Sequence, residues 1–340
     1  MTGMVIFQIS PLHTYQRRLG SAEIDAASQD AHLYVISRRP RTTVHEGTAF
    51  NSSALKTVTH SGRTGRRIGS MTTAIRGAQV LHENAYWTGE HDGHKVHGEA
   101  WHLAALTSDR DPEVSTQEIL YIGQSYGNAG SRNASMRATS HSKLIEAYEE
   151  NHASDWDVFF TPLIVEETIT LNDDHIIDSD DNFQWADPSI QSSLFSADGV
   201  RPSKLAVDTL EHLLIAYFEP RMNMKLINWS HTKQNRILRD LGYRLLTAQL
   251  LSLHELALFF SAKRQAARTH AIAAEVPGVA FGTEFSIGTF SELETIPARA
   301  TELIGASMDH LASMAEKEPG VLRIFGDSHP GRNPDFSAWQ

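Results

Sequence analysis

The chain has 340 residues, of which 41% are hydrophobic and 21% are charged, and its formal net charge is -11 at pH 7. This composition is ordinary for a globular protein, and one hydrophobic core rarely organises more than ~250 residues, so we expect two or three domains. The absence of cysteine excludes disulfides and thiolate zinc sites, and the acidic net charge argues against a surface coated with basic residues.

The N-terminal residues contain no basic stretch followed by a long apolar core, and no window approaches the ~20 apolar residues that a membrane helix needs. We therefore expect a cytoplasmic protein with no membrane partner; its oligomeric state stays open. Two basic runs, residues 38–67 and 233–268, flank a strongly acidic stretch at 166–198. Solvated faces and phosphate-contacting flanks are both compatible with this charge pattern.

The N-terminal region, residues 1–98, is expected to be β-rich. Short strand-like runs occur at residues 5–9 and 32–36, separated by clusters of Gly, Ser, Thr and Asn. No repeat of fixed period is present, and the pattern does not specify a fold for this region.

The central region, residues 99–228, has a regular alternation of predicted elements. We expect strands at residues 100–106, 118–122 and 157–165. We expect helices at residues 131–148 and 203–218, a glycine-rich loop at 123–130, and an acidic insertion at 166–202.

The C-terminal region, residues 229–340, is expected to be mainly helical. Residues 234–274 and 293–317 have helical composition, and a short hairpin is expected between residues 279 and 290. The polar tail after residue 326 is expected to be loosely ordered.

Three short motifs carry the chemical signal. The first reads Y-I-G-Q-S from Tyr121 to Ser125, at the end of a predicted strand. The second places Arg137 and His141 four residues apart on the next helix. The third reads E-x-x-L-I-x-x-F-x-P-x-x-N and begins at Glu211.

Arg137 and His141 lie on one face of their predicted helix because residues four apart are neighbours there. A guanidinium beside an imidazole, near a loop whose backbone donors point outward, suits the binding of a phosphate. The alternative is an Arg and a His on the solvated side of an amphipathic helix.

Glu211 falls within or beside an apolar stripe that Val207, Leu214 and Phe218 form at helical spacing. A carboxylate in that position is costly unless it is paired or coordinates a cation, and no basic residue follows within one turn. A hydrated divalent ion would satisfy it. The alternatives are a position at the edge of the stripe or an ion pair with a distant Arg.

Taken in order, these motifs resemble the GIY-YIG nuclease superfamily over residues 99–228. The family pattern has a G-I-Y-like strand, a strand ending in Y-I-G, an Arg and a His on the next helix, and a late E-x-x-L-I-x-x-x-x-P-x-x-N. The second triad is present at Tyr121 to Gly123, and the last block matches from Glu211 to Asn223. The resemblance implies a central small antiparallel three-stranded sheet flanked by helices, hence an α+β fold.

The first triad departs from the family pattern. The strand expected there starts Ala100-Trp-His-Leu and has no tyrosine, although this family commonly assigns a first-triad tyrosine to positioning the attacking water. Three alternatives follow: His102 substitutes for it, His141 acts as the base, or the domain is inactive.

The resemblance implies a metal-dependent endonuclease that cleaves nucleic acid, with DNA favoured over RNA. Glu211 would hold Mg²⁺ or Mn²⁺, and Arg137 would neutralise charge on the phosphate. Tyr121, with His141 or His102, would orient and deprotonate water. Gly123, Gln124, Ser125 and Asn223 would contact the substrate or anchor the loops around it. A restriction, phage-defence or mobile-element enzyme would fit a nuclease core with unfamiliar flanks, by analogy alone.

Two rival interpretations remain. One is a non-catalytic nucleic-acid-binding or interaction module built on the same fold. The other is a separate metal site in the histidine-rich tract, with the nuclease likeness coincidental. The tract holds His91, His94, His97 and His102. Its spacing fits no standard zinc module, and a solvated hairpin is the simpler interpretation.

Overall fold

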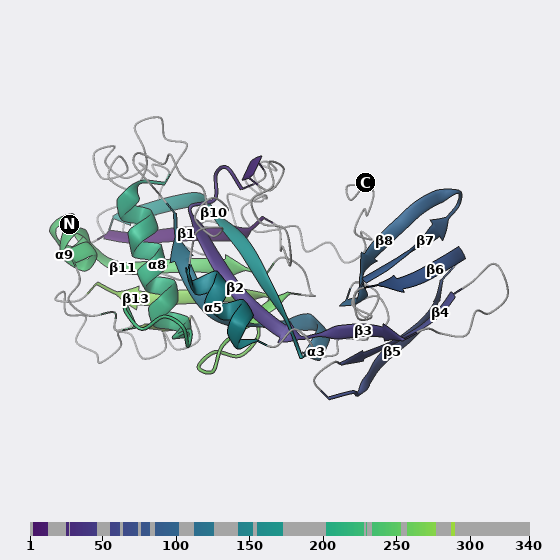
Figure 1. Cartoon of the computed structure of the whole chain (residues 1–340). Helices are drawn as coiled ribbons and strands as arrows, with labels where there is room; N and C mark the ends of the chain where they lie inside the picture. Colours follow the sequence, from purple (N-terminus) through teal and green to yellow (C-terminus); the bar gives the residue numbers. More distant parts are fainter. Residues whose placement is uncertain are drawn as a thin grey trace.

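The computed structural model describes residues 3–12, 25–26, 28–45, 55–61, 64–73, 76–81, 86–101, 112–125, 142–151, 155–172, 202–227, 229, 233–252, 257–276 and 287–289. Within them, strands from distant parts of the sequence form one large sheet, and a smaller β-structure extends from one end of it (Figure 1). Candidate functional residues lie on the large sheet and on the helices that cover it.

The large sheet has eight strands among the described residues. In spatial order they are β12 (Leu258–Phe260), β9 (Thr116–Gln124), β2 (Leu33–Pro40), β10 (Trp156–Asn172), β1 (Gly3–Pro11), β11 (Tyr243–Leu251), β13 (Thr269–Glu275) and β14 (Ile287–Thr289). Neighbours are antiparallel except at two places, where β1 pairs with β11 and β12 pairs with β9 in parallel.

Helices cover both faces of this sheet. The described helices are α3 (Pro112–Ser115), α5 (Ser142–Glu150), α8 (Lys204–Phe218) and α9 (Lys233–Asp240). On one face, α8 packs over Leu33, Val35 and Ile122 in the larger core cluster, which also takes Leu238 from α9. On the other face, α5 packs over Tyr34 and neighbouring side chains in a smaller cluster. Alternate residues of β2 therefore serve opposite cores.

Helix α8 begins and ends with standard capping groups. Ser203 precedes the helix in extended conformation, and its hydroxyl accepts a hydrogen bond from the Ala206 amide. At the C-terminus Glu219 adopts a left-handed conformation, with φ of 46°, and its amide donates to the Ile215 carbonyl. Pro220 then prevents continuation. This is the helix predicted at residues 203–218, and its position is confirmed.

The extension consists of two three-stranded antiparallel sheets. One contains β3 (Thr42–His45), β4 (Leu55–Ser61) and β5 (Arg67–Thr73); the other contains β6 (Arg76–Leu81), β7 (Tyr86–His91) and β8 (His94–Glu99). Strands β7 and β8 pair as a hairpin with His91 opposite His94, so the hairpin interpretation of the histidine-rich tract is confirmed for its described part.

A buried arginine lies where β2 leads into the extension. The Arg39 guanidinium stacks on Trp101 at 4.0 Å and on Phe159 at 4.6 Å, measured to the ring centroids, and its Nη1 donates to the Val114 carbonyl at 2.9 Å. Burial lowers its pKa to about 10, an effect that the charge of nearby Asp157 opposes. Arg39 thus joins β2, β10 and helix α3 at the base of the extension.

The fold expected from the family resemblance is wrong. We expected a small antiparallel three-stranded sheet flanked by helices, and the structure instead has a mostly β fold with few helices and a mixed sheet. The reason is long-range pairing. Strand β1 joins β10 on one side and the C-terminal strand β11 on the other, so strands from all three expected regions share one sheet.

The prediction of a mainly helical C-terminal region is also wrong. Of the described residues in the segment expected to be helical, 234–274, only 234–240 form a helix, as part of α9, and β11, β12 and β13 follow. Strand β11 lies between β1 and β13, and its residues Leu246, Ala248 and Leu250, spaced two apart, are buried in the larger core cluster. Adjacent leucines at 245–246 and 250–251 obscure this alternation in the sequence, so the composition resembled that of a helix.

Shorter predictions had mixed outcomes. The strands predicted at residues 5–9, 32–36, 118–122 and 157–165 are confirmed. The strand predicted at 100–106 is wrong at its start, because Ala100 and Trp101 form a helical turn. Strand β10 continues to Asn172, into the stretch expected to be an insertion. The predicted helix at 293–317 and the tail lie outside the described residues.

Candidate functional site

The Y-I-G motif lies on β9 and pairs with β2, not with the strand expected from residue 100 onward. Gly123 is opposite Tyr34 and Tyr121 is opposite Ile36. The register then shifts so that Leu120 is an extra residue in β9, a β-bulge. The described strand across from the second triad is therefore β2, which carries Tyr34; the expectation of a first triad without a tyrosine stays a prediction.

Residue 123 must be glycine because two tyrosine rings lie against its backbone and leave no room for a side chain. A Cβ placed on Gly123 would lie 2.6 Å from Tyr34 Cζ and Oη and 2.7 Å from Tyr121 Cε1. The two ring centroids are 6.1 Å apart. Tyr34 is fully buried and Tyr121 is half-buried. Glycine at this position lets β2 place Tyr34 across the end of β9.

Asn223 completes the edge of β9. Its side-chain Nδ2 donates to the Ile122 carbonyl at 2.9 Å, and its Oδ1 accepts from the Ile122 amide at 2.9 Å. The Met222 amide donates to the Leu120 carbonyl at 3.0 Å. The segment after α8 thus satisfies backbone groups of β9 as another strand would. Ser125 continues the pairing on the β2 side, where its amide donates to the His32 carbonyl at 2.9 Å.

Gln124 joins β9 to helix α8 through two carboxylates. Its Nε2 donates to Glu211 Oε2 at 2.7 Å and to Asp208 Oδ1 at 2.8 Å. Asp208 also pairs with Lys204 Nζ at 2.6 Å. One amide nitrogen therefore lies between two acidic oxygens, so that both carboxylates face the same point.

Glu211 is an acid held in a partly buried position. Burial is the main reason that its pKa rises to about 7, and the charge of Asp208 raises it further. The hydrogen bonds from the Gln124 side chain and backbone, and the charge of Lys204, act in the opposite direction. Among the described residues no Lys or Arg forms an ion pair with Glu211. Ionised Glu211 is therefore stabilised mainly by Gln124.

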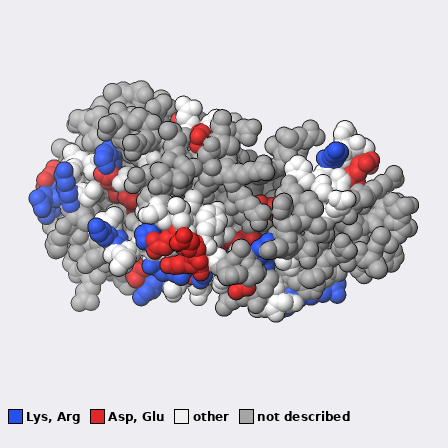
Figure 2. Space-filling model, viewed as in Figure 1, with Lys and Arg blue, Asp and Glu red and all other residues white. Residues whose placement is uncertain are grey.

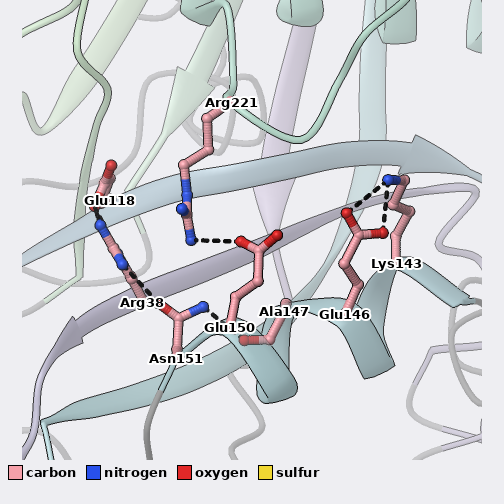
Figure 3. Close-up of polar contacts among 8 residues, drawn as sticks. All are labelled: Arg38, Glu118, Lys143, Glu146, Ala147, Glu150, Asn151 and Arg221. Carbon is pink, nitrogen blue, oxygen red and sulfur yellow. Dashed lines mark hydrogen bonds and ion pairs between the residues drawn. The ribbon is translucent and has the colours of Figure 1, made fainter.

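The opposite face is held by a different set of polar contacts, drawn in Figure 3. Arg38 binds Glu118 at 2.7 Å and donates to the Asn151 Oδ1 at 2.6 Å. Arg221, in the segment after α8, pairs with Glu150 of α5 at 3.2 Å. These contacts fix α5 to β2 and to the segment that closes the edge of β9.

The predicted site residues form two groups around the end of β9. Gln124 and Glu211 lie on the face covered by α8. Tyr121 and Gly123 lie toward Tyr34 on the face covered by α5. Alternation along a strand explains this separation, since Tyr121 and Gln124 are three residues apart. Arg137, His141 and His102 lie outside the described residues, so the structure does not place them.

The donor set around Gln124 fits a magnesium-like ion bound partly through water and substrate. Such an ion commonly takes one or two protein carboxylates and keeps several waters. Glu211 and Asp208 supply two carboxylates that both accept from the Gln124 amide nitrogen, so an ion bound between them would replace that donor. In the part of the chain that is described, no group of three or more potential ligands (His, Asp or Glu) gathers in one place.

Sequence reasoning missed two residues of this region. Tyr34 lay in a strand that was predicted, but nothing local indicated that β2 pairs with β9 across the whole extension. Asp208 precedes Glu211 by three residues, which places both on one helix face. That spacing was readable from the sequence and was overlooked because it lies outside the family pattern.

No described helix combines the length and apolar character needed to cross a membrane. No protein-family model matches the chain, and neither the curated proteins nor the solved structures include a match.

Proposed function

We propose that this protein is a metal-dependent nuclease that hydrolyses phosphodiester bonds of nucleic acid, with DNA as the favoured substrate. The chain resembles the GIY-YIG nucleases in its motifs, although not in the overall sheet expected from them. The proposal rests on the residues of those motifs and on the contacts between them.

The observation that supports it best is the junction of the two motifs. Gln124, directly after Y-I-G, donates to Glu211, the first residue of the late motif, at 2.7 Å. Asn223, the last residue of that motif, makes both of its amide hydrogen bonds to Ile122, the central residue of Y-I-G. Both ends of the late motif thus contact the strand that carries Y-I-G, which a coincidental likeness would not require.

Each residue has a proposed role. Glu211, with Asp208 beside it, would hold one Mg²⁺ or Mn²⁺, which when bound supplies positive charge against the scissile phosphate. Gln124 is a positioning residue, because it holds both carboxylates from the end of β9. Asn223 positions α8 by closing the edge of that strand. Arg137 would bind the non-bridging phosphate oxygens.

The tyrosines impose a condition on the mechanism. In this proposal Tyr34, which pairs with Gly123 of the second triad, would stand for the first-triad tyrosine. Tyr34 is fully buried, so half-buried Tyr121 would be the tyrosine that orients the attacking water. The substrate would then have to reach around the end of β9, where the two faces meet beyond Gln124. His141 or His102 would otherwise act as the base on the Glu211 side.

Cleavage of supercoiled plasmid tests the proposal. The control variant E149Q is altered at an exposed position on α5. Both it and the wild-type protein should cleave the plasmid with Mg²⁺ or Mn²⁺ at roughly 5–10 mM, a concentration expected to saturate the site. Neither should cleave it in EDTA. The variant E211Q should lose at least about a hundredfold in rate. Equal rates for E211Q and E149Q would refute the role of Glu211.

A second candidate function is a nucleic-acid-binding module without cleavage. The separation of Tyr121 and Glu211 onto opposite faces of β9 favours this alternative. It predicts that the wild-type protein binds DNA but leaves plasmid intact with every divalent ion tested.

A further inference from the structure

The basic residues of the C-terminal half divide into two kinds in the structure. Arg264 is turned inward: its Nε donates to the Tyr217 carbonyl at 3.0 Å, and its guanidinium lies 4.2 Å from the centroid of the Tyr217 ring. Helix α9, in contrast, carries Lys233, Arg236 and Arg239 on its exposed side. Helix α9 therefore carries three of the outward-facing cations of this basic run, and exposed Lys263 and Arg268 lie apart from it in the sequence.

These three side chains follow helical spacing. They stand three residues apart, while Asn235 and Leu238 on the opposite side of α9 are buried. At 1.5 Å per residue they extend over about 9 Å of helix axis. One strand of duplex DNA presents two or three phosphates over that length, at about 3.4 Å each.

The positive charge of α9 is largely unneutralised. Several other described lysines face a carboxylate within 4 Å; examples are Lys143 with Glu146, Lys204 with Asp208 and Lys263 with Glu219. Within the described residues no carboxylate forms an ion pair with Lys233 or Arg236, and Arg239 meets only its neighbour Asp240, at 3.8 Å. Figure 2 shows this basic area at the edge of the molecule where α9 lies in Figure 1. In a chain with a net charge of -11 such an area is distinctive.

Helix α9 is fixed rigidly to the helix that carries Glu211. Asn235 Nδ2 donates to the Trp229 carbonyl at 2.6 Å, and Trp229 Nε1 donates to the Glu275 carbonyl at 2.6 Å. The Trp229 ring packs on His212, the residue after Glu211, with 4.8 Å between ring centroids. Both helices cover the same face of the sheet, so a strand of nucleic acid held on α9 would lie on the Glu211 side.

We propose that the exposed face of α9, formed by Lys233, Arg236 and Arg239, is a docking surface for the phosphate backbone of duplex DNA. This inference extends the proposed nuclease function, and the choice of DNA as the partner rests on that function. Charge complementarity is its basis, and the contacts are to phosphates, so the surface would add affinity without sequence preference.

Fluorescence anisotropy with a labelled duplex of about 30 base pairs in EDTA tests this surface, since binding is measured without cleavage. The triple variant K233Q/R236Q/R239Q should bind at least about tenfold more weakly than wild type. The plot of log affinity against log salt concentration should have a slope that is shallower by about 2 to 3 than that of wild type. Each phosphate contact contributes about 0.9 to this slope, and the variant loses up to three contacts. The matched triple K95Q/K143Q/K263Q removes the same charge from other surfaces and should bind as wild type does.

Several outcomes would overturn the proposal. Equal weakening in the two triple variants would mean that net charge alone controls binding. Absence of DNA binding by the wild-type protein would also contradict it. So would a result in which the α9 substitutions weaken binding to phosphatidylserine vesicles but not binding to DNA. Because the assay contains no metal ion, it is independent of the plasmid test. If the protein binds DNA through α9 but does not cleave plasmid, the nuclease proposal is refuted and the docking surface on α9 is supported. Circular dichroism melts confirm that both triples fold.

Discussion

The raised pKa of Glu211 makes a quantitative prediction about stability in the absence of metal. Its pKa is about 7 in the folded protein, against 4.5 for the unperturbed group, mainly because of burial. Well below pH 4.5 the carboxyl is protonated in both states and does not affect stability. Between pH 4.5 and 7 the unfolded state loses this proton while the folded state keeps it, so stability falls over that window and levels off above pH 7.

The variant E211Q removes that charge and keeps an acceptor for Gln124. A shift of about 2.5 pKa units corresponds to about 3 kcal/mol, at 1.36 kcal/mol per unit. E211Q should therefore be more stable than wild type by about 3 kcal/mol at pH 8.5, but by only about 1 kcal/mol at pH 5.

Urea unfolding in EDTA at these two pH values measures the difference directly. The variant E149Q, with its substitution on the exposed side of α5, provides the baseline for loss of one surface carboxylate. A gain for E211Q that does not change with pH would refute the reasoning, and so would a loss of stability at pH 8.5.

Three further predictions concern the framework of the site. Asn223→Ala leaves the buried amide and carbonyl of Ile122 unpaired, so it should lower the free energy of unfolding by about 2–4 kcal/mol; hydrogen exchange should show faster exchange at Ile122, and unchanged protection would contradict the edge-closing role. Gly123→Ala places a Cβ against Tyr34 and should cost about 1–3 kcal/mol in thermal unfolding, with a smaller cost in a Tyr34→Ala background; equal costs in both backgrounds would exclude that clash. Arg39→Met removes the guanidinium between the Trp101 and Phe159 rings and leaves Asp157 buried beside it. The substitution should lower the free energy of unfolding by about 3–5 kcal/mol. An unchanged free energy in urea unfolding would show that the guanidinium does not anchor the extension.

Much of the local structure could be predicted from the sequence. Helix α8 has a Ser N-cap, a leucine-rich stretch and a terminal proline, all of which are local signals. The strands around Tyr34 and Tyr121 likewise have short apolar runs bounded by polar or glycine residues. The weight placed on Glu211 came from a local feature too, namely an acid in an apolar stripe with no basic neighbour within one turn.

The sheet could not be predicted from these signals. Strand pairing between β1 and β11 joins residues 3–9 to residues 243–250, and no short-range pattern specifies it. The partner of β9 was misplaced for the same reason: the nearest preceding strand-like segment was chosen, whereas β2 pairs with β9 after the chain has formed the whole extension. Tyr34 was consequently missed as a neighbour of the Y-I-G motif.

The central claim is that the Glu211 carboxylate, held by Gln124 beside Asp208, is kept for a divalent cation. Thermal unfolding at pH 8 with and without Mn²⁺ tests it most directly, because an ion that binds only the folded state raises the melting temperature. We predict a rise for wild type and for E149Q that increases with Mn²⁺ concentration, and no rise for E211Q. An equal rise in all three proteins, or none in wild type, would contradict the claim.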